Sequence, residues 1–234
     1  MNVTVADFRQ SLVAVGRVGW RNLVGLVVVT LTVWLTMVPL LAVLVVGTPI
    51  AILGGLWTTC LLLGIALVVV FRFTSRAVER GVGVALWPSF RAAADQIRVG
   101  LALGATTFGI LVVSLAVVGV SPDPYWGTAV GISGFLLVFW YLLVGLASPE
   151  LAVGSSLGTA IRAGGLRFVS SPILAVWFLF LSVLASLVAG ATLITLLVFL
   201  PGVLGLLAMQ IATDIATVEE VSTLPVAQRD EDSS

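Results

Sequence analysis

The longest uncharged stretch of the chain limits the possible folds more than any other feature. Residues 22–71 contain no Asp, Glu, Lys or Arg, which makes 50 consecutive uncharged residues. One helix needs only about 20 apolar residues to cross a bilayer, so this stretch must cross the membrane and fold back. The sequence "VGTPIA" supplies the turn and predicts spans at about 22–46 and 50–71. Pro39 lies inside the first span and removes one backbone hydrogen bond, which predicts a kink there.

The composition agrees with a membrane-embedded chain. Hydrophobic residues make up 60% of the 234 residues and charged residues only 9%, whereas an average soluble domain carries about 25% charged residues. We therefore predict an all-α fold, a polytopic transmembrane helical bundle whose first partner is the lipid bilayer. The formal net charge is zero, which gives no electrostatic case for nucleic acid as a partner. The single cysteine, Cys60, excludes an intrachain disulfide.

The remaining apolar runs predict four more spans, at about 99–120, 127–148, 172–189 and 191–213. Residues 172–213 hold no charge, and as one helix they would be about 63 Å long, roughly twice the hydrocarbon core of a bilayer. A break near Gly190 is favoured over one at Pro201-Gly202, because it leaves two segments near spanning length. A five-span form with an external tail is the alternative. Residues 1–216 thus form one transmembrane domain of about six spans, and 217–234 a disordered, acidic, cytoplasmic tail.

Three polar segments have the pattern of amphipathic helices that lie on the membrane surface. In residues 89–98, apolar side chains follow helical spacing on one side, and charged side chains fall on another. Residues 151–170 show a similar pattern, although Gly164 and Gly165 weaken it, and so does the segment before the first span. We predict interfacial helices on the cytoplasmic face, with the helix at 89–98 running into the third span.

The distribution of arginine predicts the orientation. Three segments hold ten of the eleven basic residues: those before the first span, between the second and third, and between the fourth and fifth. Alternating spans place these segments on one face, which the positive-inside rule makes cytoplasmic. We therefore expect a multi-pass protein of the plasma membrane with a cytoplasmic N-terminus. The residues that set this topology are Arg72, Arg76, Arg80, Arg91, Arg98, Arg162 and Arg167.

A serine between glycines in the fourth span raises the question of catalysis. Gly131-Ile132-Ser133-Gly134 matches the short nucleophile motif of rhomboid-type intramembrane proteases. A serine nucleophile needs a base to take its proton, and the chain contains neither histidine nor lysine. We therefore reject a protease. The same lack of histidine, with one cysteine and no acid cluster in the spans, excludes a zinc or di-iron site. We expect no cofactor and no enzymatic activity.

Small residues in the spans predict helix contacts instead. In a bilayer, small side chains let helix backbones approach closely, because lipid gives no hydrophobic drive for association. The candidates are Gly127, Gly131, Ser133 and Gly134 in the fourth span, Gly100 and Gly104 in the third, and Ser182, Ser186 and Gly190 in the fifth. We expect these faces to pack against one another.

A small-solute permease is the alternative function. Transporters use broken helices that offer backbone groups to a substrate, and prolines interrupt two spans here, at Pro39 and at Pro201-Gly202. The spans contain no ionisable residue at mid-membrane, which transporters often have.

The order of these features resembles the YesL-like family of small prokaryotic membrane proteins. The resemblance rests on Asn22, on Trp34 and Pro39 before "GTPIA", and on "PSFRAAADQIRVG" and "SSLGTAIRAGGLRFVSSPIL". It covers most of residues 8–212. It implies an all-helical protein of a prokaryotic plasma membrane, in a family with some members associated with sugar uptake. The expected function is thus a non-enzymatic accessory or interaction component, with other membrane proteins of an uptake system as partners.

Overall fold

The computed structural model describes residue 13 and residues 15–80, 84–191 and 200–213, and every regular element in them is helical. The elements are α2 (Leu23–Leu35), α3 (Val38–Val46), α4 (Pro49–Arg80), α5 (Leu86–Ala94), α6 (Ile97–Val120), the short 3-10 helix η1 (Asp123–Tyr125), α7 (Trp126–Leu146), α8 (Ser148–Val153), α9 (Leu157–Ser170) and α10 (Pro172–Ala191). A further helix covers Leu200–Thr213. The predicted all-α fold is confirmed. The tail at 217–234 and most of the N-terminal segment lie outside the described residues.

The first predicted span consists of two helices, α2 and α3, with a break at Thr36 and Met37. The Thr36 hydroxyl donates a hydrogen bond to the carbonyl of Val33 at 2.6 Å. Pro39 lies in the first turn of α3, where a missing N–H costs nothing. The predicted kink therefore exists, but it precedes the proline.

The second span is longer than predicted. After a turn in which Gly47 adopts a left-handed conformation with φ of 74°, α4 continues for 32 residues to Arg80. The helix continues past the first charge, and α2, α5, α6 and α8 all pack against it.

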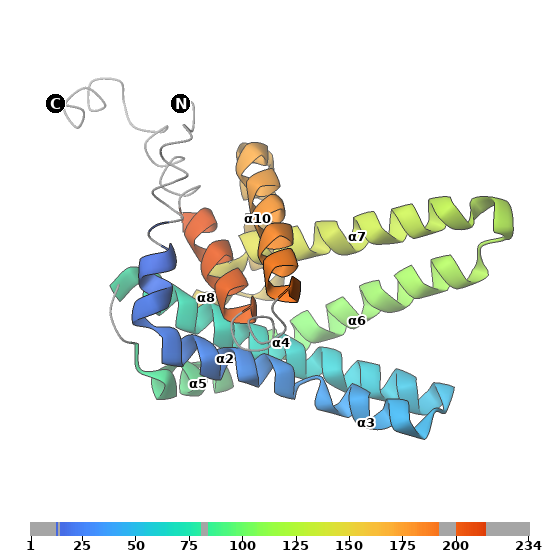
Figure 1. Cartoon of the computed structure of the whole chain (residues 1–234), viewed down its shortest axis with the longest axis horizontal. Coiled ribbons are helices and arrows are strands. Elements are labelled where there is room, and N and C mark those ends of the chain that lie inside the picture. The colour runs from blue at the N-terminus through green and yellow to red at the C-terminus, as the bar shows by residue number, and fades with distance from the viewer. Residues whose placement is uncertain (1–12, 14, 81–83, 192–199, 214–234) are drawn as a thin grey trace.

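Two hairpins define the ends of the bundle (Figure 1). The turn between α3 and α4 and the turn between α6 and α7 lie at the same end of the molecule, apart from each other, and we call this the hairpin end. The opposite end holds the last turns of α4 together with α5 and α8, and we call it the arginine-rich end. Tyr125 and Trp126 are exposed at the tip of the α6–α7 hairpin, as expected for aromatic side chains at a membrane interface.

The helices predicted on the membrane surface are shorter than expected. The helix expected at 89–98 ends at Ala94, and a bend at Asp95 and Gln96 separates it from α6. The segment 151–170 forms two helices, α8 and α9, which are separated at Gly154, where φ is 98°. The break falls at Gly154 rather than at the two glycines inside α9.

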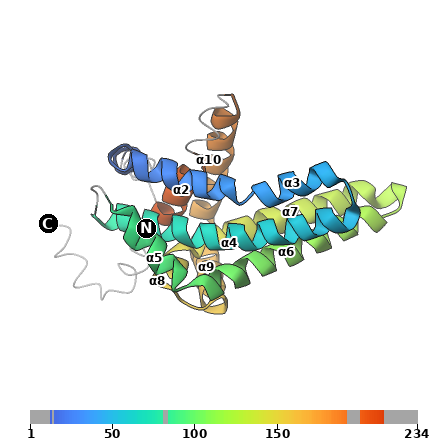
Figure 2. The same ribbon diagram turned by 90° about the horizontal axis from the view of Figure 1, so that it is seen from below.

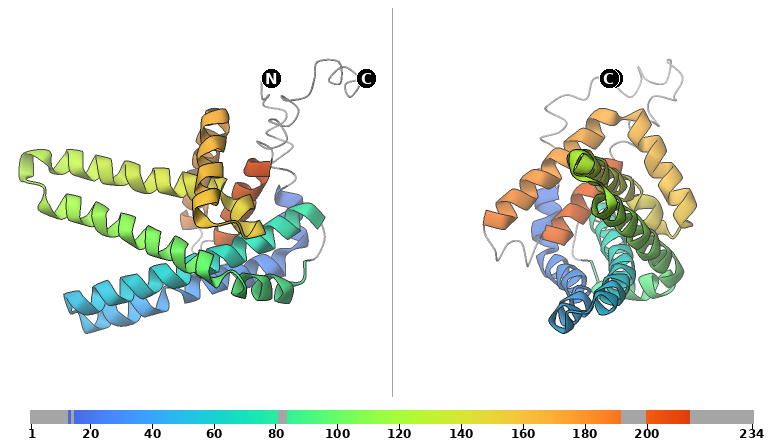
Figure 3. Two further views of the ribbon diagram at one scale, coloured as in Figure 1. Left: turned by 180° about the vertical axis from the view of Figure 1, so that it is seen from behind. Right: turned by 90° about the vertical axis from the view of Figure 1, so that its right-hand side faces the viewer.

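Four helices are long and apolar enough to cross a membrane, or five if a bent pair is counted as one span; both counts refer to the described residues. The bent pair is α9 with α10, and its two parts meet at 103°. Seen along α3, α4, α6 and α7, helix α10 lies across their direction (Figure 3). The helix Leu200–Thr213 has 14 described residues, about 21 Å, which is shorter than a bilayer core. Residues 192–199 lie outside the described residues, so the last two predicted spans stay a prediction, and the protein is membrane-embedded through at least the four long helices.

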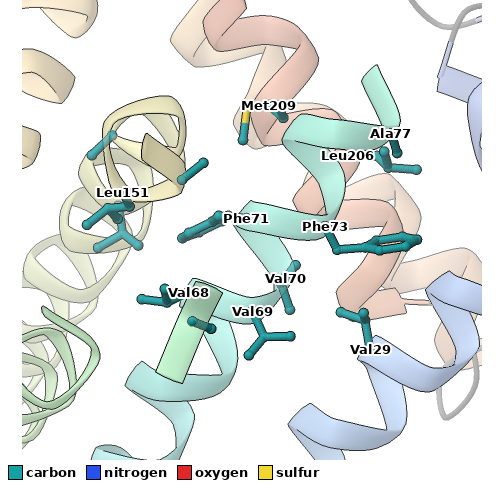
Figure 4. Close-up of a cluster of buried hydrophobic side chains, with 14 of the residues drawn as sticks. Val29, Val68, Val69, Val70, Phe71, Phe73, Ala77, Leu151, Leu206 and Met209 are labelled. Carbon is teal, nitrogen blue, oxygen red and sulfur yellow. The ribbon is translucent and has the colours of Figure 1, made fainter. Parts of the chain in front are cut away.

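The core surrounds the second half of α4 (Figure 4). Val68, Val69, Val70 and Phe71 are all buried, and so is Phe73. A helix that is apolar and buried on every side has neighbours all round. Here the neighbours are α2, α8 and the helix Leu200–Thr213, which contribute Val29, Leu151, Leu206 and Met209. The well-packed part of the bundle thus lies toward the arginine-rich end.

Candidate functional site at the arginine-rich end

Glycines bring α4 and α6 into backbone contact. A methyl group added at Gly104 would collide with the Cys60 carbonyl oxygen and lie 2.7 Å from the Leu61 Cα. One added at Gly100 would lie 2.8 Å from the Ile65 Cα, and one at Gly64 would meet the backbone of α6. Gly100 and Gly104 are therefore packing residues, but their partner is α4. The sequence predicted that the small-residue faces of the third, fourth and fifth spans pack against one another, whereas Gly100 and Gly104 face α4, which carries its own small residue, Gly64, at the crossing point.

The glycines around Ser133 have no such neighbour. A methyl group added at Gly127, Gly131 or Gly134 would meet nothing within 4 Å in the described residues. Their predicted role in helix packing stays a prediction. Ser133 itself is buried, and its hydroxyl donates a hydrogen bond to the Ser114 carbonyl of α6 at 3.1 Å. The hydroxyl thus links the two helices of the hairpin.

Of the three small residues predicted in the fifth span, one makes a contact between helices. Ser182 is buried, and its hydroxyl accepts a hydrogen bond from the Tyr141 hydroxyl of α7 at 2.9 Å. Ser186 bonds back to the carbonyl of Ser182 in its own helix. Gly190 lies in α10, but its surroundings are outside what the structure describes.

Arg72 joins three helices at the arginine-rich end. Its Nε donates to the Gln96 side-chain oxygen at 3.3 Å, and its Nη2 donates to the Val153 carbonyl at 3.3 Å. Gly154 makes this approach possible, because a methyl group there would collide with the Gln96 side chain and lie 3.2 Å from Arg72 Nη2. Arg72 therefore caps the last turn of α8 while it contacts the start of α6.

Arg76 lies one turn further along α4, on the same side of the helix as Arg72. Its Nη1 lies 3.4 Å from the hydroxyl of Ser89, which is fully buried in α5. The other predicted topology residues of this region, Arg80, Arg91 and Arg98, are exposed. Helices α4, α5 and α6 thus bring the arginines of the loop between the second and third spans to one end.

Arg167 forms the one ion pair within the described residues. Its Nη2 lies 3.1 Å from Glu150 Oε1, and its Nη1 donates to the Leu146 carbonyl at 2.8 Å. The Ser155 hydroxyl donates to the other oxygen of Glu150. The Arg167 side chain is only 13% exposed, so the pair holds α7, α8 and α9 together. Arg162, on the same helix, is exposed.

Asn22 fastens the start of α2 to the segment before α5. It is buried, and its side chain donates to the Val18 carbonyl and accepts from the backbone N–H of Val84, both at 3.0 Å. A pocket of about 270 Å³ opens beside it, lined by Trp20, Arg21, Asn22, Leu23, Val24, Gly25, Val84 and Leu86. The pocket is mostly apolar.

The described helix Leu200–Thr213 contacts α2 inside the bundle. The backbone N–H of Gly202 donates to the Thr30 hydroxyl at 3.2 Å, and a methyl group at Gly202 would lie 2.8 Å from Leu26. Thr30 is seven residues into α2, about 11 Å along it. Residues 192–199 lie outside the described residues, so the predicted kink at Pro201 stays a prediction.

The residues brought together at the arginine-rich end hold neighbouring helices in place through hydrogen bonds and an ion pair. No group of three His, Cys, Asp or Glu side chains among the described residues is placed to hold a metal. Sequence reasoning missed Gln96, Val153 and Gly154 as partners of Arg72, and it gave Glu150 no role beyond ending a span. The spacing of Glu150 and Arg167 gave no signal, because the two residues meet only through the turn at Gly154.

Comparison with known proteins found no family, no curated protein and no solved structure that matches the chain.

Proposed function

We propose that this protein is a non-enzymatic interaction component of a prokaryotic plasma membrane, which binds another membrane protein of an uptake system through the hairpin end of its helices. One observation carries the proposal. Six glycines on the parts of α4, α6 and α7 toward the hairpin end face nothing within 4 Å among the described residues, namely Gly54, Gly109, Gly119, Gly127, Gly131 and Gly134, whereas Gly64, Gly100 and Gly104 contact a neighbouring helix. Gly55 is an exception at the hairpin end, because a methyl group there would meet the Val43 side chain of α3.

Glycine inside a helix costs about 1 kcal/mol relative to alanine. Where a glycine lets two helices touch, close packing offsets that cost, as at Gly104. At Gly131 and Gly134 none of the described helices provides the contact. Large apolar side chains are also exposed around them, among them Ile132 and Phe135 of α7. A transmembrane helix of a second protein fits this surface chemically, and the link to solute uptake rests on the resemblance alone.

The orientation belongs to the same proposal. The arginines of the segments 72–98 and 157–170 are gathered at the end opposite the two hairpins, as the positive-inside rule requires of a cytoplasmic face. We therefore place the arginine-rich end and the N-terminus in the cytoplasm, and the hairpin end outside.

Site-specific crosslinking in the native membrane tests the interaction. A photoreactive residue at Ile132 should crosslink to a membrane protein that is then identified by mass spectrometry, and Gly131→Leu should abolish the crosslink. Because nothing lies within 4 Å of Gly131, the variant should unfold at the wild-type temperature. Gly158→Leu, at an equally open glycine of α9, is the matched control and should leave the crosslink unchanged. A crosslink only to lipid, or one that Gly131→Leu does not change, would refute the proposal.

A small-solute permease is the second candidate, and one specific observation favours it. A helix end lies inside the membrane-embedded part, at the break at Thr36 and Met37 between α2 and α3. Ends of this kind offer backbone groups to a solute. Uptake of a solute into proteoliposomes that contain only this protein would favour the permease over the interaction component.

A further inference from the structure

We propose that Arg72 and Arg76 form a binding site for the phosphate of an anionic phospholipid at the arginine-rich end. The proposal goes beyond the interaction with a second membrane protein and uses the opposite end of the helices. It rests on the charge balance of the site, on its depth in the membrane and on the side chains that flank it.

The first argument is the charge balance. Residues 72–98 hold five arginines, at 72, 76, 80, 91 and 98, against two acids, Glu79 and Asp95. Within the described residues, neither acid comes within 4.0 Å of an arginine nitrogen. Glu79 instead accepts a hydrogen bond from Ser75 at 2.7 Å, and Asp95 is exposed. Asp95 acts on the charge of Arg72 from a longer distance. Among the described residues the site therefore keeps an excess of positive charge, and neither Arg72 nor Arg76 forms an ion pair there.

The second argument concerns the donors that remain. Arg72 uses its Nε and one N–H of Nη2 to bind the side chain of Gln96 and the Val153 carbonyl. Arg76 has one partner, Ser89, at the long distance of 3.4 Å. A guanidinium has more N–H donors than these acceptors use. Its planar fork matches two oxygens of a phosphate, and the contacts of Arg72 hold its fork in one orientation.

The third argument is depth. Arg72 is the first charged residue after Pro49, and the helix between them is about 35 Å long at 1.5 Å per residue. That length exceeds the roughly 30 Å hydrocarbon core by a few ångströms. When Pro49 lies at one interface, the guanidinium of Arg72 therefore lies among the headgroups of the other leaflet, where lipid phosphates are.

Exposed tryptophans mark the same level. Trp87 in α5 is 76% exposed and Trp20 is 79% exposed, and both belong to the arginine-rich end. Tryptophan is enriched where the hydrocarbon meets the headgroups. An anionic lipid fits better than a zwitterionic one, because the excess of arginine repels a choline group. Clusters of arginine beside a transmembrane helix commonly bind such lipids.

Native mass spectrometry of the purified full-length protein in detergent tests the site. Phosphatidylglycerol should bind saturably and phosphatidylcholine much more weakly. Each arginine near an anionic lipid contributes an interaction equivalent to about a fivefold change in affinity. Arg76→Gln should therefore lower the affinity for phosphatidylglycerol about fivefold. The double variant that carries Arg72→Gln and Arg76→Gln should lower it about thirtyfold. Arg162→Gln, which removes an exposed arginine of α9, is the matched control and should change little.

The other outcomes are also decisive. Equal weakening by Arg162→Gln and Arg76→Gln would show a diffuse charge effect and overturn the site. Displacement of phosphatidylglycerol by an equal concentration of inorganic phosphate would keep the phosphate site but overturn the lipid as its ligand. Arg72→Gln removes the cap of α8, so the double variant has the greater risk of misfolding. Arg76→Gln alone then decides, since Arg76 makes only the long contact to Ser89, and unchanged lipid affinity in that variant would refute the proposal.

Discussion

Replacement of Gly104 by alanine should loosen the contact between α4 and α6. The added methyl group would collide with the carbonyl oxygen of Cys60 and lie 2.7 Å from the Leu61 Cα, whereas ordinary contacts begin at 3.4 Å. The colliding atoms belong to the backbone of α4, so no side chain can rotate to relieve the collision. The two helices must therefore separate by roughly 0.7 Å or more along a contact that positions the core.

The expected loss follows from two opposing effects. Overpacking of this kind costs about 1–3 kcal/mol, and backbone against backbone belongs to the upper part of that range. Alanine regains up to about 1 kcal/mol over glycine through helix propensity. Gly109→Ala on the same helix should show only that gain, because nothing lies within 4 Å of Gly109. The two variants should thus differ by about 2–3 kcal/mol, or about 4–12 °C in unfolding temperature for a chain of this length.

The single cysteine provides the assay. Cys60 is 5% exposed and lies at the contact itself, so a maleimide dye reacts with it only when α4 and α6 separate or the protein unfolds. Dye reaction during heating in detergent should begin at a lower temperature for Gly104→Ala than for Gly109→Ala. Gly64→Ala combined with Gly104→Ala should cost less than the sum of the two, because both methyl groups enter one gap. Equal midpoints for Gly104→Ala and Gly109→Ala would refute the close approach of the two helices.

Three further predictions concern single contacts and orientation. Ser133→Ala should lower the free energy of unfolding by about 0.6 kcal/mol, which is typical of a hydrogen bond within a membrane. An active-site serine probe should label neither the wild type nor the variant. Labelling of the wild type alone would restore the protease hypothesis. Glu150→Ala should destabilise the protein in thermal unfolding by about 1–3 kcal/mol, because the largely buried Arg167 loses its charged partner. Arg162→Ala should have little effect. Equal losses of stability in the two variants would show that the ion pair is unimportant. In a Cys60→Ala background, the variant Asp123→Cys should react with an impermeant thiol reagent from outside the cell, and Arg91→Cys should not. Both positions are exposed. The reverse labelling pattern would therefore invert the proposed orientation.

Much of the fold could be predicted because it depends on local properties of the chain. The uncharged run from 22 to 71 exceeds twice the length of one span, and the polar turn at Gly47 is the only place within it where the chain can reverse. The positions of α6 and α7 followed from the apolar runs beside "SPDPYWG" in the same way. Hydrocarbon excludes unpaired backbone groups and charges, so apolar length and polar interruptions are sufficient to locate these helices.

Contacts between helices could not be predicted from the same signals. Gly100, Gly104, Gly131 and Gly134 look alike in the sequence, yet only the first two touch a neighbouring helix. The partner of Gly104 is determined by the position of Gly64 on α4, which depends on how the two helices cross. A glycine offers the same space to any neighbour, so spacing alone does not identify the neighbour.

The sequence by itself determined that the chain enters a membrane, where its long helices lie and which segments carry the arginines. These properties depend on the free energy of transfer of each residue from water to lipid. That free energy is determined by the composition and order of the residues. Only the tertiary structure decided that Arg72 caps α8, that Glu150 meets Arg167, and that α10 lies across the other helices. Those contacts join residues far apart in the chain, through turns such as Gly154 whose direction depends on the packing of the whole bundle.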